Sequence, residues 1–232
     1  IRNGATAKLS YLLHKINTRH LPVHITPPVR LMLEGLTKHL SFPANLVLKQ
    51  LLNPNLTDTV LDFLGDQGNF FAPLLHHTIA PTIIRGGTKI NVIPGEITVD
   101  FDGRLLPGFK PQDLIDELHR LVGPNYQFQT TCYIPGPPSP NLALYETLAA
   151  ILREMDPEAI PIPLTVSGAT DARYFSQLGI QTYGFTPMNL PPELNFSKLL
   201  HAADERIPIH ALEFGTQAIF KLLQKTTPKG TV

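Results

Sequence analysis

The chain has 232 residues, of which 43% are hydrophobic and 16% charged, values typical of a globular protein with a substantial core. Nineteen basic side chains balance nineteen acidic ones, so no net field favours nucleic acid or an anionic membrane as a partner. The sequence contains no apolar run near the roughly 20 residues needed to cross a bilayer, and no visible signal peptide, so we expect no membrane partner.

The chain begins with a pattern typical of a helix, in which apolar residues recur on one face: Ala5, Leu9, Leu12, Leu13 and Ile16. A natural chain rarely starts with Ile followed almost at once by a helix, so we expect an N-terminal part to be missing. A mostly helical section follows at about 22–77, with candidate helices at 29–40, 44–52 and 57–66.

Two strands are predicted next, at 78–85 and 96–104, followed by a helix from Pro111 to Gly123 and a strand at 126–133. The order helix, insertion, strand, strand, helix, strand lacks one initial strand of a ferredoxin-like domain. Cys132 lies on the apolar face of the last strand, so we expect a buried thiol. A single cysteine excludes an internal disulfide and favours a reducing, cytoplasmic location.

A proline-rich segment at 135–140 is the best candidate for a domain boundary. Beyond it we expect helices at 141–154 and 209–224, and between them strands at 160–166 and 180–185. A helix that starts near Asp171 and stops at Gly179 joins these strands, which the right-handed crossover rule makes parallel. The fold class is therefore α/β, with domains at 1–134 and 135–232.

Polar residues follow the strands of this predicted unit. Ser167, Gly168 and Thr170 follow the first strand, and His201 lies in the loop beyond the second. Ligands in open α/β sheets bind at the carboxyl ends of the strands, so both loops can face one pocket. From the pattern alone, an ordinary capped turn is equally consistent with the bend at 167–170.

Two stretches carry a resemblance to a known family. SGATDARYF, YGFTP and LLHAADERIPI, at 167–209, resemble the closing part of the zinc-dependent aminoacylase, acetylornithine deacetylase and carboxypeptidase family. APTIIRGGTKINVIPGEITVDFDGRLLPG, at 80–108, resembles the core hairpin of that family's lid, or dimerisation, domain. The resemblance implies a ferredoxin-like lid without its first strand, with a helical insertion at about 22–77. It also implies that 135–232 is the C-terminal portion of an α/β metallohydrolase catalytic domain.

The resemblance also assigns roles to residues. His201 would bind one of two divalent metals, zinc by expectation, with cobalt or manganese as alternatives. Asn91 and Arg104 would contact a small-molecule or peptide substrate, because a guanidinium suits a substrate carboxylate. Ser167, Gly168 and Thr170 would line the substrate pocket. The chain has no His-x-Asp and no Glu-Glu pair, so we expect no catalytic residue in this chain and little metal binding or activity by it alone.

The resulting interpretation is a metal-dependent hydrolase of amide or peptide bonds, active as a homodimer. The alternative is a non-catalytic dimerisation or binding module that retains the fold. A serine hydrolase is a weaker third interpretation, because VSGAT lacks the G-x-S-x-G elbow. His76 and His77 are adjacent on a possible strand and would face opposite ways, so we do not expect them to form a chelating pair.

Overall fold

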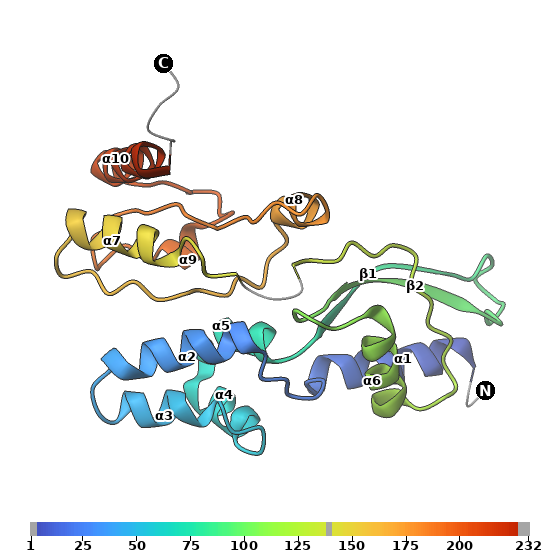
Figure 1. Cartoon of the computed structure of the whole chain (residues 1–232). Coiled ribbons are helices and arrows are strands. Elements are labelled where there is room, and N and C mark those ends of the chain that lie inside the picture. Colours follow the sequence, from blue (N-terminus) through green and yellow to red (C-terminus); the bar gives the residue numbers. More distant parts are fainter. Residues whose placement is uncertain (1–3, 138–140, 227–232) are drawn as a thin grey trace. The chain divides into compact units, whose positions relative to one another are not determined.

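The computed structural model describes residues 4–137 and 141–226 (Figure 1). The chain divides into two compact units. The first is Ile1–Pro140 with Pro163–Ile180, and the second is Asn141–Ile162 with Gln181–Val232. Each unit is described by itself.

The first unit opens with helices that build its larger apolar core. These are α1 (Ala5–Thr18), α2 (Pro27–His39), α3 (Ala44–Gln50), α4 (Thr57–Leu64), the short 3₁₀ helix η1 (Gly65–Gln67) and α5 (Gly68–Leu75). Two prolines occupy the first turn of α2, where their missing N–H groups have no helical partner to lose. The core comprises Val29, Met32, Leu33, Leu51, Leu61, Leu74 and Leu75.

Gly68 allows a close approach between α4 and α5. A Cβ atom at this position would lie only 2.3 Å from the carbonyl oxygen of Leu61, so any larger residue would push the two helices apart. This approach brings the end of α5 near the start of α4.

The sheet of the first unit is an antiparallel hairpin of β1 (Thr78–Gly86) and β2 (Ile97–Arg104) (Figure 1). The register pairs Thr78 with Arg104 and Gly86 with Ile97, with an irregularity after Pro81, which has no N–H for the ladder. Helix α6 (Pro111–Val122) packs Leu114 and Leu118 against Leu21 in a second small core. It ends at Gly123, whose φ of 88° is readily available to glycine.

The predicted helices and the hairpin are therefore confirmed, and the chain is a mixed helix and strand protein. Three predicted strands are wrong, because the structure gives residues 126–133, 160–166 and 180–185 no strand conformation. Within the described residues the hairpin is the whole sheet, so the ferredoxin-like sheet and the parallel unit are not confirmed. A strand needs a neighbour to satisfy its backbone groups, and these segments have none. Cys132 is exposed rather than buried, since its strand does not form.

The apolar residues of the unformed strands are correspondingly uncovered. Leu164 and Val166 are 65% and 64% exposed. The short helix α8 (Ala172–Gln177) does follow this segment, with Asp171 at its N-cap as the sequence predicts.

The second unit contains α7 (Tyr145–Met155), the single-turn α9 (Phe196–Leu199) and α10 (Ile209–Thr226). Glu154 of α7 accepts hydrogen bonds from two lysines of α10, at 2.5 Å from Lys221 Nζ and 3.2 Å from Lys225 Nζ. These hydrogen bonds lower the pKa of Glu154. In the part of the chain that the structure describes, none of the helices has the length and apolar character required to span a bilayer.

Candidate functional site

The two predicted lid residues lie at opposite ends of the hairpin. Asn91 is exposed in the loop between the strands, and Arg104 is the last residue of β2. The Nε atom of Arg104 donates to Asp102 Oδ2 at 3.1 Å. Seven residue steps along β2 correspond to about 24 Å, so one chain does not bring Asn91 and Arg104 to the same small molecule.

The predicted pocket residues Ser167, Gly168 and Thr170 are exposed in the bend before α8. This bend belongs to the first unit, whereas His201 belongs to the second. His201 is exposed and has a φ of 60°, a conformation that residues other than glycine rarely adopt. The proximity of His201 to the bend therefore stays a prediction.

Within the described residues, His201 is not part of a cluster of three or more metal-ligating side chains. Among the described residues, two groups of three or more His, Cys, Asp or Glu side chains converge closely enough to hold an ion, and His201 is in neither.

One of the two groups, which we call the outer cluster, consists of His20, Asp58 and His76. His20 follows α1, Asp58 lies in the first turn of α4, and His76 directly follows α5. Asp58 Oδ1 lies 3.2 Å from His20 Nδ1 and 3.2 Å from His76 Nε2. The side chain of His76 is 2% exposed, whereas those of His20 and Asp58 are 45% and 59% exposed.

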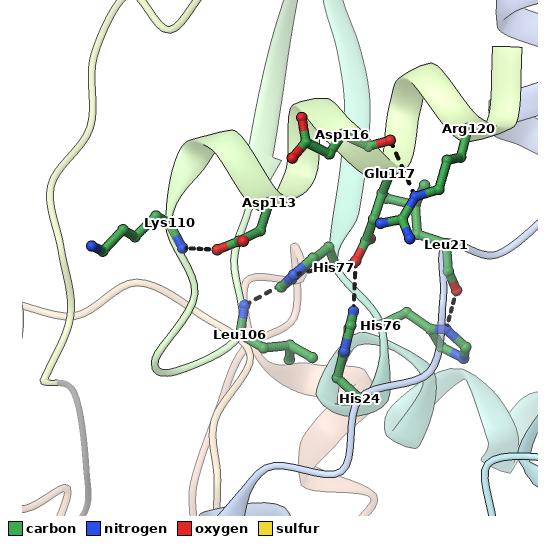
Figure 2. Close-up of polar contacts among 10 residues, drawn as sticks. All are labelled: Leu21, His24, His76, His77, Leu106, Lys110, Asp113, Asp116, Glu117 and Arg120. Carbon is green, nitrogen blue, oxygen red and sulfur yellow. Dashed lines mark hydrogen bonds and ion pairs between the residues drawn. The ribbon is translucent and has the colours of Figure 1, made fainter. Parts of the chain in front are cut away.

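The other group, the inner cluster, consists of His24, His77 and Glu117 (Figure 2). Glu117 projects from α6, and its Oε1 lies 2.6 Å from His24 Nε2 and 3.9 Å from His77 Nε2. The backbone N–H of Leu106 donates to His77 Nδ1 at 3.1 Å. The centroid of the Phe109 ring lies 4.4 Å from that of the His24 ring and 4.7 Å from that of the His77 ring.

Burial controls the charge of the adjacent histidines. Desolvation lowers the pKa of His76, and it lowers the pKa of His77 to about 4, with a smaller electrostatic contribution from the neighbouring His24. Both rings are therefore neutral near pH 7, and each offers one N–H and one lone pair.

The sequence predicts correctly that His76 and His77 do not chelate one ion together, because their rings enter different clusters. It does not predict the clusters themselves. Their partners lie far away in sequence, Asp58 being 38 residues from His20 and Glu117 93 residues from His24. The sequence did contain one signal, namely two histidines four residues apart, His20 and His24, and a second pair at His76 and His77. In the structure an isolated antiparallel bridge between Val23 and His76 brings these two segments together.

Comparison with known families decides the ancestry. Residues 2–129, more than half of the chain, match the peptidase dimerisation domain of M20 enzymes. The chain belongs to the M20 peptidase family. The match covers both clusters, the hairpin and α6, so the M20 dimerisation domain contains every residue discussed above except the bend at 167–170 and His201.

Sequence similarity to individual proteins supports the same ancestry. The chain is 32% identical over 201 residues to the human N-fatty-acyl-amino acid synthase/hydrolase PM20D1, covering 83% of this chain and 39% of that protein. It is 27% identical over 192 residues to succinyl-diaminopimelate desuccinylase of Hydrogenovibrio crunogenus, covering 81% of this chain and 48% of that protein. A probable carboxypeptidase S-like 2 of Dictyostelium discoideum is 27% identical over 153 residues, 64% of this chain and 29% of that protein.

The chain thus spans less than half the length of these relatives. No solved structure matches it significantly. The family resemblance expected from the sequence is confirmed, and the relatives are named as hydrolases or peptidases.

Proposed function

We propose that this chain is part of a metal-dependent hydrolase that cleaves an amide bond in a substrate with a carboxylate, as in an N-acyl amino acid or a peptide. The observation that carries the proposal is the match of residues 2–129 to a peptidase dimerisation domain, together with relatives named for amide hydrolysis. In this proposal residues 1–134 form the lid, with the helical insertion at about 22–77, and residues 135–232 form the C-terminal portion of the catalytic domain.

The length of the hairpin supports a homodimer. Asn91 and Arg104 are separated by the whole of β2, about 24 Å, yet the family resemblance assigns both to substrate. In a dimer joined through the dimerisation domain, both residues can reach the same substrate in spite of this separation, because one protomer supplies Asn91 and the other supplies Arg104. The active enzyme is therefore a dimer whose sites are shared, and its one cysteine suits a reducing compartment such as the cytoplasm.

Arg104 binds the substrate carboxylate through its guanidinium, which can donate two parallel hydrogen bonds. Asp102, at 3.1 Å from Arg104 Nε, holds the guanidinium plane in place while its terminal nitrogens stay available. Ser167, Gly168 and Thr170 line the pocket, and Asn91 reaches it from the lid. His201 is one ligand of a divalent metal, zinc by preference or cobalt or manganese, which supplies Lewis-acid chemistry when the full ligand set is present.

The test uses the intact protein encoded by the complete gene. His201→Ala should lower both metal content and turnover of N-acyl amino acids, whereas His210→Ala, an exposed histidine of α10, should change neither. Unchanged metal content and turnover in His201→Ala would overturn the assignment. An intact protein without hydrolase activity, but dimeric, would instead support the non-catalytic module.

Arg104→Ala provides a second arm that addresses substrate rather than metal. We expect an increase in KM for substrates with a free carboxylate and a smaller change for the corresponding methyl esters, because only the carboxylate pairs with the guanidinium. Equal effects on the acid and the ester would exclude Arg104 as the carboxylate partner.

A further inference from the structure

The hydrogen bonds of His76 determine which of its ring nitrogens carries the proton. Nδ1 lies 2.6 Å from the backbone oxygen of Leu21, and a carbonyl oxygen can only accept, so Nδ1 carries the hydrogen (Figure 2). With the hydrogen on Nδ1, Nε2 of the neutral imidazole keeps its lone pair. This nitrogen is shielded from solvent and makes no hydrogen bond in the described part of the chain.

The bare nitrogen points at a carboxylate. His76 Nε2 lies 3.2 Å from Asp58 Oδ1, so two lone pairs face one another at close range. Such a contact is favourable only if a proton or a cation lies between the two atoms. A metal cation would satisfy both atoms, since each offers it a lone pair.

The distances match those of a metal site. Zinc binds histidine nitrogen at about 2.0–2.1 Å and carboxylate oxygen at about 2.0–2.2 Å, which places tetrahedral ligand atoms roughly 3.3 Å apart. Asp58 Oδ1 is 3.2 Å from His20 Nδ1 and 3.2 Å from His76 Nε2, and all three ligand atoms lie within 4.8 Å of one another. His76 Nδ1 donates to the backbone oxygen of Leu21, and a hydrogen bond of this kind from the second ring nitrogen fixes the orientation of a metal-binding histidine.

We propose that the outer cluster binds a divalent transition-metal ion of the zinc type, held by His20 Nδ1, Asp58 Oδ1 and His76 Nε2. Two imidazoles select zinc, cobalt, nickel or copper over magnesium and calcium, which prefer oxygen ligands. His20 and Asp58 are about half exposed, so water completes the coordination. The ion joins three segments that are distant in sequence, namely the end of α1, the start of α4 and the end of α5, and so stabilises the helical section against the rest of the lid.

The inner cluster cannot hold the same ion, although it has the same kinds of side chain. The N–H of Leu106 donates to His77 Nδ1, so Nδ1 accepts and carries no hydrogen, and the ring hydrogen is on Nε2. That Nε2–H is directed toward Glu117, 3.9 Å away, and has no lone pair for a metal. The inner cluster therefore serves as an internal control for metal binding by the outer cluster.

The experiment uses the full 232-residue chain, stripped of metal with a chelator and dialysed. Titration with Zn²⁺ followed by calorimetry should give one equivalent, and Co²⁺ should give the visible absorption of a low-symmetry site with nitrogen ligands. His20→Ala and Asp58→Asn alter exposed side chains, so these variants should fold. Each should weaken Zn²⁺ binding by about 100-fold or more, since even outer-shell changes cost roughly 10- to 100-fold.

Matched control variants test whether Zn²⁺ binds at the outer cluster or at other side chains. Asp62→Asn, one turn further along α4, and His39→Ala, both exposed side chains, should bind Zn²⁺ like the unaltered chain. His201→Ala should also retain the equivalent, so the result does not depend on the proposed hydrolase site. Absence of stoichiometric Zn²⁺ uptake, or uptake unchanged by both His20→Ala and Asp58→Asn, would overturn the proposal.

Discussion

The outer and inner clusters are built from the same materials, two histidines and one carboxylate each, and they meet at neighbouring residues, His76 and His77. They differ in how the backbone engages a single Nδ1 atom. In the outer cluster a carbonyl accepts from His76, whereas in the inner cluster an N–H donates to His77. The tautomers are therefore opposite, and only His76 presents a lone pair to its carboxylate.

The two clusters also differ in solvent access. The side chain of Glu117 is 2% exposed and its Oε1 lies 2.6 Å from His24 Nε2, while the side chain of Asp58 is 59% exposed. When one partner of a buried pair is removed, the other is left buried without a partner, and the free energy of unfolding falls strongly. We therefore expect the inner cluster to control folding and the outer cluster to control ligand binding.

The largest expected effect is that of Glu117→Ala. Removal of the carboxylate leaves His24 Nε2 without its acceptor at 2.6 Å and opens a cavity beside α6. We expect the free energy of unfolding to fall by about 3 kcal/mol, measured by urea denaturation. Asp116→Ala, exposed on the same helix, should change it by no more than about 0.5 kcal/mol. A small loss for Glu117→Ala would mean that the inner cluster is not a folding element.

The second-largest effect is expected from acidification, which should lower the free energy of unfolding through His77 of the inner cluster. The folded-state pKa of His77 is about 4, below its unfolded value of 6.5, so the unfolded chain binds a proton first as the pH falls. The stability that neutral His77 contributes is fully present above pH 6.5 and is lost between about pH 6.5 and 4, in total about 3 kcal/mol. Urea denaturation of the unaltered chain and of His77→Gln across this range checks the prediction, because the substituted chain should lose correspondingly less. Parallel curves for the two proteins would contradict it.

Metal should stabilise the protein through the outer cluster alone. Zn²⁺ at 100 times its dissociation constant should add about 2.7 kcal/mol, because it binds the folded state and not the unfolded one. Thermal denaturation with and without Zn²⁺ should show this increase for the unaltered chain and for Asp62→Asn but not for Asp58→Asn. Equal increases in both variants would place the ion elsewhere.

The smallest effect is expected for Asp58→Asn without metal. Asp58 lies in the first turn of α4, where a negative charge interacts favourably with the helix dipole, and it is 59% exposed. Its loss should cost about 0.3–1 kcal/mol in urea denaturation. A loss as large as that of Glu117→Ala would remove the contrast between the clusters.

Local sequence signals were sufficient for most of the helices and for the hairpin. Prolines mark the starts of α2 and α6, Gly123 marks the end of α6, and alternation in β2 marks the hairpin. The same kind of signal failed at 126–133, 160–166 and 180–185, because an apolar β-branched run describes a strand only when another strand pairs with it. That partner is not specified by the run itself.

The sequence by itself determined the family, the approximate positions of most helices and the hairpin, since all of these depend on residues close together in the chain or on recognisable motifs. Only the tertiary structure decided that His20, Asp58 and His76 converge, and that Glu117 meets His24 and His77. The physical reason is that these contacts depend on how helices pack across many intervening residues. The choice of tautomer depends in addition on a single backbone group, the carbonyl of Leu21 or the N–H of Leu106, placed against each ring.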